Sequence, residues 1–350
     1  MWASPSSCCI ESGKSELRRL GRIFFAFISF GFLPSASAHD MDQRSASADP
    51  VQAVRAVMST PDDKVDFARA KLTFDKLYDP STDIEAQLKQ IDHMVHTIGT
   101  MAGPSASSRL RLIALHKFLY EAGSWNDNVP FAYDMTDPRG HKPASQLLSK
   151  YIRMHRGNCV SMPVLFIALA QRLGLKATLS TVPDHVFAKY TDDATGRTLN
   201  LETTRAAVPV TDDYYLKNIP MTDAAIANGI YMKTLSKKEA LVVMATEVLD
   251  SALMHRRFRE ILDLVEVLRP YYPNDLAVLL MPADAGIGML DKEFRAKYPK
   301  RTDVPPELLG RLGFLERSVD NALNHAYALG WRESDGADEL ALQAATTAPK

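Results

Sequence analysis

Cys159 is the residue whose type and position point most directly to chemistry, because it is the only cysteine after position 9. It follows Arg-Gly-Asn and precedes an apolar stretch at 164–173 that favours a helix. A thiol at the start of a helix lies beside unpaired backbone amides and the positive end of the helix dipole, which stabilise the thiolate. This setting favours a nucleophile over a small buried core residue, the commoner role of a free cysteine.

A histidine within reach of this thiol would take its proton and later return it to a leaving group. His185 lies 26 residues after Cys159, at the start of a β-rich stretch. A third polar group on the next strand would orient the imidazole. Asn200 and Glu202 are two residues apart and therefore share one face of that strand, so both remain open, with Glu202 slightly favoured. Asp184 is a weaker candidate.

Two other features of the site also remain open. His155, four residues before Cys159, is a rival partner for the thiol. An oxyanion needs at least two donors, and the backbone amide of Cys159 is one of them. The second donor is Asn158, Arg156 or Tyr190, and the sequence does not choose between them.

The elements that must position these residues follow from periodicity and turn signals. Helices are expected from residues 60, 82, 108 and 143, followed by the helix after Cys159. Strand-like runs at 176–182, 186–190 and 198–203, separated by short turns, predict an antiparallel meander. From residue 236 the pattern changes to helices, at 237–253, 258–268 and 307–329.

The ends of the chain have a different character. Residues 1–38 read as a signal peptide, because basic residues precede an eleven-residue apolar run and a Ser-Ala-Ser-Ala stretch. We therefore expect an exported protein, periplasmic or secreted, with no membrane span after cleavage. Residues 39–58 are expected to form a disordered leader, because they are polar and rich in alanine and serine. Residues 332–350 are expected to form a disordered tail, because they contain too little apolar surface to pack.

Composition removes other classes of function. The chain has 41 basic and 42 acidic side chains and no basic run mixed with aromatic residues, so nucleic-acid binding is not expected. His93 and His96 are spaced for one helix face but have no third ligand nearby, so no metal is assigned to them. We expect no cofactor.

Several of these segments together resemble the transglutaminase-like superfamily. They are Arg-Gly-Asn-Cys159, Ala-Gln-Arg-Leu-Gly-Leu at 170–175, Pro-Asp-His185-Val-Phe, and Leu-Asn-Leu-Glu-Thr-Thr at 199–204. The resemblance covers residues 60–215 and is greatest to a bacterial branch with N-terminal helices and C-terminal tetratricopeptide-like helices. It departs at the third position, where the family usually has Asp followed by Pro and this chain has Glu202 followed by Thr.

The resemblance implies an α+β fold, papain-like, in which the nucleophile helix packs on a small antiparallel sheet. We expect a transglutaminase-like domain with its helical segment at 59–220 and a helical region at 236–331. Cys159 would be the nucleophile, His185 the base, and an acid on the next strand the orienting residue.

Two functions from different classes are compatible with this pattern. The first is a thiol enzyme acting on an amide of a peptide or protein, with hydrolysis favoured over cross-linking. The second is a non-catalytic scaffold that binds peptides or proteins, for which the C-terminal helices are a candidate partner surface. The reactivity of Cys159 discriminates between them.

Overall fold

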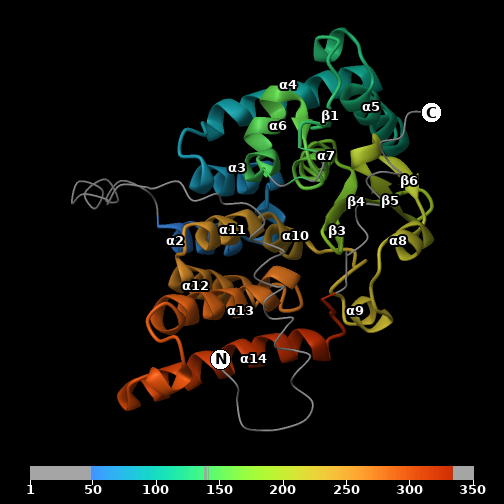
Figure 1. Cartoon of the computed structure of the whole chain (residues 1–350). Coiled ribbons are helices and arrows are strands. Elements are labelled where there is room, and N and C mark those ends of the chain that lie inside the picture. The colour runs from blue at the N-terminus through green and yellow to red at the C-terminus, as the bar shows by residue number, and fades with distance from the viewer. Residues whose placement is uncertain (1–48, 138–139, 141, 334–350) are drawn as a thin grey trace.

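The computed structural model describes residues 49–137, 140 and 142–333. The chain folds into helices around one small antiparallel sheet, as the predicted α+β class requires (Figure 1). The predicted signal peptide and nearly all of the predicted tail lie outside the described residues. No helix among those described is both long enough and apolar enough to cross a membrane.

The sheet contains four strands in the order β3-β4-β5-β6, and every neighbouring pair is antiparallel. The strands are β3 (Lys176–Val182), β4 (His185–Thr191), β5 (Thr198–Glu202) and β6 (Val208–Val210). The first three confirm the predicted meander to within one residue at each end. Separately, β1 (Ala132–Tyr133) pairs in parallel with β2 (Arg156–Gly157).

The helix after Cys159, α7 (Ser161–Arg172), packs against β3 and β4. All but its last two residues are buried. Such a helix has no polar face, because it is enclosed by the sheet and by other helices. The helices between residues 60 and 160 are α3 (Phe67–Tyr78), α4 (Ile84–Ala102), α5 (Ser108–Tyr120) and α6 (Leu148–Met154).

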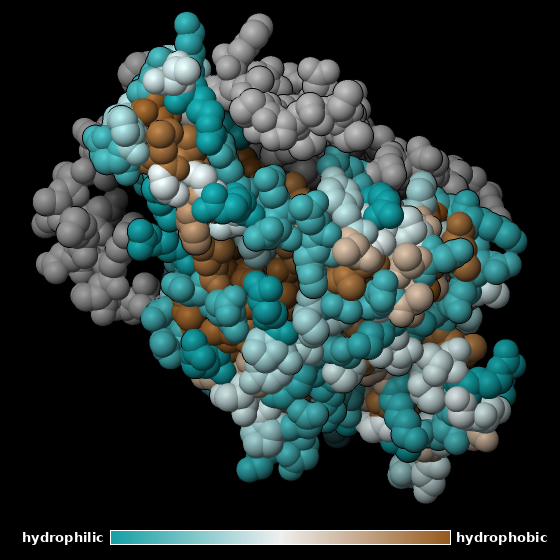
Figure 2. Space-filling view, turned by 90° about the horizontal axis from the view of Figure 1, so that it is seen from below, coloured by the Kyte–Doolittle hydropathy of each residue, from teal (hydrophilic) through white to brown (hydrophobic). Residues whose placement is uncertain are grey.

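After the sheet come two short helices and then the helical region. The short helices are α8 (Asp212–Asn218) and α9 (Asp223–Ala227). The longer ones are α10 (Lys237–Met244), α11 (Thr246–Met254), α12 (Phe258–Leu268), α13 (Leu276–Leu290) and α14 (Leu309–Ala328). In Figure 1 α12, α13 and α14 lie below the sheet, with α14 outermost, and α10 and α11 lie between them and α3. Seen from that side, apolar residues gather in a furrow between hydrophilic ridges (Figure 2).

One hydrophobic core runs through both parts of the chain. Leu72 of α3, Leu165 of α7 and Leu249 of α11 belong to the same cluster of buried side chains. The helix α11 contacts α3, and α10 contacts β3. The C-terminal helices therefore share their apolar interior with the helices that surround the sheet.

The structure corrects three expectations about the helices. Residues 50–58, which were expected to belong to a disordered leader, form helix α2 (Pro50–Met58). Asp49 caps this helix, and its Val54 and Met58 are fully buried where α2 packs on α12. The helix expected from residue 60 begins at Phe67, where Asp66 is the N-cap. The helix expected at 237–253 is two helices, α10 and α11, which meet at Ala245.

Candidate active site

Cys159 lies two residues before α7, in a turn built by its neighbours. The Asn158 side chain accepts hydrogen bonds from the amides of Val160 (2.9 Å) and Ser161 (3.3 Å). In return, the Ser161 hydroxyl accepts from the amide of Asn158 (3.0 Å) and donates to the Ser145 carbonyl (2.8 Å). Among the described residues the amide of Cys159 itself has no acceptor. The turn therefore uses the amides on both sides of the thiol and leaves that of Cys159 available.

Gly157 is required by this turn. A Cβ at this position would lie 2.3 Å from the Ser161 hydroxyl oxygen and 2.6 Å from the ring of Tyr151. Real Cβ atoms do not approach other atoms so closely, so a side chain here would displace Ser161 and the turn that it closes.

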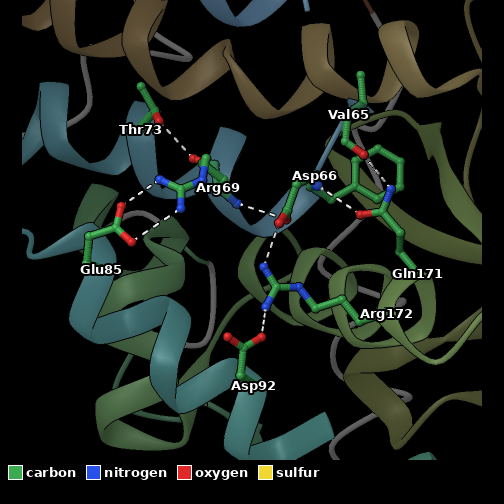
Figure 3. Close-up of polar contacts among 9 residues, drawn as sticks. Val65, Asp66, Arg69, Thr73, Glu85, Asp92, Gln171 and Arg172 are labelled. Atoms are coloured by element: carbon green, nitrogen blue, oxygen red, sulfur yellow. Dashed lines mark hydrogen bonds and ion pairs between the residues drawn. The ribbon is translucent and has the colours of Figure 1, made fainter. Parts of the chain in front are cut away.

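The far end of α7 is tied to the N-terminal helices, as Figure 3 shows. The Gln171 side chain accepts from the Phe67 amide (3.0 Å) and donates to the Val65 carbonyl (2.7 Å). Arg172 bridges Asp66, at 2.6 Å, and Asp92. These contacts hold the start of α3 against the end of the helix that follows Cys159.

His185 comes to the thiol through the tight turn between β3 and β4. Asp184 in that turn has a left-handed φ of 54°, and its carbonyl lies 4.0 Å from the Cys159 sulfur. His185 opens β4, and its ring lies near enough to the Cys159 side chain for that side chain to raise the pKa of the imidazole. The antiparallel turn thus brings together two residues that are 26 positions apart.

Glu202 is the residue that contacts the other side of the imidazole. Glu202 is the last residue of β5, and its Oε2 lies 2.8 Å from the His185 Nε2. Because Nε2 binds Glu202, Nδ1 is the ring nitrogen left for the thiol. Asn200 shares the face of Glu202 but donates instead to Asp212 of α8 (2.7 Å). The structure therefore brings Cys159, His185 and Glu202 together and places Asn200 outside the group.

Two further residues complete the surroundings of Glu202, and the sequence reasoning missed both. Thr204 donates to Oε1 from its amide (3.1 Å) and its hydroxyl (2.6 Å). The Tyr215 hydroxyl, from α8, donates to Oε2 (2.8 Å). Thr204 had a local signal, because a residue two positions after an acid commonly bonds back to it. Tyr215 had none, since it lies on a separate element.

Residues 85–208 match the sequence model of the transglutaminase-like superfamily. The chain therefore contains a transglutaminase-like domain. The match includes Cys159, His185 and Glu202 and begins within α4, later than the residue 60 at which the resemblance was expected to start. Comparisons with curated proteins and with solved structures gave no match.

Within the transglutaminase-like domain, opposite charges govern the ionisation of His185 and Glu202. Burial alone would lower the pKa of His185, but the Glu202 carboxylate and the Cys159 side chain outweigh it, so this pKa lies well above its usual value. Burial alone would raise the pKa of Glu202, but His185, Thr204 and Tyr215 together lower it. The pair is therefore an imidazolium and a carboxylate over the neutral range.

The rival residues near Cys159 either have other partners or face the other side of the sheet. The His155 ring binds the Val129 carbonyl (2.6 Å) and stacks on Phe131, with ring centroids 3.8 Å apart. Arg156 donates to the carbonyls of Pro130 (2.9 Å) and His155 (2.8 Å). Tyr190 is five residues from His185 on the same strand and so faces the opposite side of the sheet, in the core.

The histidines that were assigned no metal, His93 and His96, are both exposed on α4. Among the described residues no three His, Cys, Asp or Glu side chains are grouped so that they could hold a metal ion.

Proposed function

We propose that this transglutaminase-like domain is a thiol enzyme that acts on amide bonds of a peptide or protein. The observation that carries the proposal is the placement of His185, whose Nε2 lies 2.8 Å from the buried Glu202 carboxylate and whose pKa is raised by both Glu202 and the Cys159 side chain. A nucleophile, a base and an orienting acid in this order are the parts that nucleophilic acyl transfer requires. A scaffold gains nothing from holding a buried charge pair beside a thiol.

The reaction would proceed in two steps. The proton of the Cys159 thiol already resides on His185 in the starting ion pair, and the Cys159 thiolate attacks the amide carbonyl carbon to form a C–S bond. The C–N bond then breaks as His185 gives the proton to the departing amine, which leaves a thioester on Cys159. In the second step neutral His185 deprotonates the incoming nucleophile, which attacks the thioester carbonyl carbon. The C–S bond then breaks, which releases the acyl product and restores the Cys159 thiolate beside the His185 imidazolium.

The tetrahedral intermediate carries a negative oxygen that needs donors. The amide of Cys159 supplies the first, since it has no acceptor among the described residues. For the second we favour Asn158 over Arg156 and Tyr190, because its Nδ2 also lacks an acceptor there, whereas Arg156 is engaged and Tyr190 faces the core.

Hydrolysis is the favoured second step. Cys159 is only partly buried, so water can reach a thioester formed on its sulfur. Transfer to an amine requires that the site exclude water while the thioester waits. We therefore propose a peptidase or amidase ahead of a cross-linking enzyme.

The proposed setting is outside the cytosol, supported by the composition of residues 1–38. N-terminal sequencing of the protein recovered from its own cells tests this. A new N-terminus close to His39 is expected, and a protein that retains residues 1–38 contradicts export by cleavage.

The experiment that tests the enzyme proposal is alkylation by iodoacetamide as a function of pH. The full chain is labelled, and peptide mapping by mass spectrometry separates Cys159 from Cys8 and Cys9. Labelling of Cys159 is expected to persist well below the ordinary thiol pKa of about 8.5, because the imidazolium stabilises the thiolate.

Two histidine variants provide the comparison. His185→Ala is expected to move the labelling profile of Cys159 up toward that of an ordinary thiol. His155→Ala, which removes the other nearby histidine, is expected to leave the profile in place. If wild-type Cys159 labels like an ordinary thiol and His185→Ala has no effect, the enzyme proposal fails and the scaffold reading replaces it.

A further inference from the structure

Glu202 is a buried carboxylate whose two oxygens receive four hydrogen bonds. Thr204 supplies both donors to Oε1, whereas Oε2 is shared by the His185 Nε2 and the Tyr215 hydroxyl, each at 2.8 Å. Glu202 is only 2 % exposed, so these donors take the place of water around its charge. Oε2 is the oxygen that meets the imidazole, and Tyr215 is its only other donor among the described residues.

Tyr215 is held in place by its ring. The ring stacks on Phe187, with centroids 4.3 Å apart, and it is fully buried. Phe187 and His185 are two residues apart on β4 and lie on the same face of the sheet. The ring of Tyr215 therefore lies on the strand that carries His185, and its hydroxyl reaches across to Glu202 on β5.

The helix that carries Tyr215 is tied to the same strand as Glu202. Asn200 of β5 donates to the side chain of Asp212, the first residue of α8, at 2.7 Å. Asn200, a rival for the orienting role in the sequence, thus fixes one end of α8 to β5. The bond from Tyr215 to Glu202 ties the same helix to β5 again, two residues further along the strand.

We propose that Tyr215 is a positioning residue of the site, whose hydroxyl keeps the Glu202 carboxylate ionised and directed at the His185 Nε2. This inference rests on the proposed function for its catalytic meaning, because it concerns the acid that orients the proposed base. Tyr215 transfers no proton in this role, since burial and the Glu202 charge raise its own pKa far above the neutral range.

The test compares two tyrosines that are neighbours in the chain. Tyr215→Phe keeps the ring stacked on Phe187 and removes only the hydroxyl that binds Glu202. Tyr214→Phe removes a hydroxyl that makes no hydrogen bond among the described residues, from a ring in edge contact with that of Tyr215. The folding equilibrium constant of the full chain is measured by urea unfolding between pH 3 and pH 8.

The direction of the effect follows from linkage. Glu202 has a lowered folded-state pKa, so its contribution to stability is present above its unfolded pKa and is lost as pH falls through the folded value. Losing one donor should raise the folded pKa of Glu202 toward its unfolded value, because a hydrogen bond to the charged form favours that form. Tyr215→Phe should therefore lower the folding equilibrium constant about 3- to 10-fold more at pH 7 than at pH 3.

A deficit for Tyr215→Phe that is the same at both pH values overturns the inference, because it shows that the hydroxyl does not act on the charge of Glu202. An equal pH-dependent deficit for Tyr214→Phe overturns it too. The iodoacetamide profile keeps the two proposals apart. If Cys159 labels as an ordinary thiol while Tyr215→Phe behaves as expected, only the enzyme proposal fails. If Cys159 is reactive and the deficit is independent of pH, only the role of Tyr215 fails.

Discussion

Replacing Lys71 by Met should destabilise the protein more than almost any other single change on α3. Lys71 is fully buried and pairs with Asp75, also on α3, and with Glu247 on α11. The other oxygen of Asp75 accepts the amide of Ser149 at 2.7 Å, at the start of α6. The Lys71 ammonium group therefore joins α3 to α11, and its partner Asp75 also binds the start of α6.

The magnitude follows from what the substitution leaves behind. Methionine fills most of the space but leaves two buried carboxyl groups without a cation, and breaking a buried pair in this way costs about 3 to 5 kcal/mol. Burial already raises the pKa of Glu247, the Lys71 ammonium opposes that rise, and one oxygen of Glu247 has no hydrogen-bond partner among the described residues. Without Lys71 this pKa rises further.

The sign of the pH dependence is therefore fixed. An acid whose folded pKa is raised stabilises the protein at low pH, and that contribution is lost as pH rises through the folded value. The deficit of Lys71→Met should be larger at pH 8 than at pH 5. Urea unfolding at both pH values measures it, with Lys76→Met, an exposed position on α3, as a control expected within about 0.5 kcal/mol of wild type.

A deficit below about 1 kcal/mol for Lys71→Met, or one that is equal at the two pH values, would refute this reasoning about the buried charges. The double substitution Lys71→Met and Glu247→Leu removes the uncompensated carboxyl group together with the cation. It should be less destabilised than Lys71→Met alone, since an apolar pair can replace a buried ion pair at little cost.

Two further predictions concern the site itself. Gly157→Ala forces a Cβ to within 2.3 Å of the Ser161 hydroxyl and should lower the free energy of unfolding in urea by about 1 to 3 kcal/mol. The control Gly99→Ala has open space around it and should be neutral or slightly stabilising. Glu202→Gln should destabilise most between about pH 4.5 and 6.5. In that range the contribution of Glu202 is already present, and the contribution of His185 is not yet lost to rising pH. A flat pH dependence would show that the charge pair makes no net contribution.

Local signals in the chain were sufficient to single out Cys159 and His185 and to predict three strands of the sheet. A lone thiol before an apolar helix and a histidine after a tight turn identify Cys159 and His185 by their immediate neighbours. The strands β3, β4 and β5 follow from β-rich runs between turn residues, and the structure confirms them. The family match at 85–208 agrees with the resemblance carried by the same segments. Their catalytic roles stay a prediction.

Other features depend on which segments pack together, and a single sequence does not show that. Glu202 and Asn200 share one face of β5, and only the positions of β4 and α8 decide that Glu202 contacts His185 and Asn200 contacts Asp212. Helix α2 is only nine residues long, and packing against α12 and α3, with Val54 and Met58 fully buried, stabilises it.

The buried charges illustrate the same division. Sequence marks Lys71, Glu247 and Tyr215 as ordinary polar residues of helices, because ionisation and burial are properties of an environment and not of a residue type. That environment is assembled from segments more than a hundred positions apart for Lys71 and Glu247, and from a strand and a separate helix for Glu202 and Tyr215. The chain by itself determined which chemical groups were present and which local elements carried them. The tertiary structure decided which groups meet, because only packing brings distant side chains out of water and into contact.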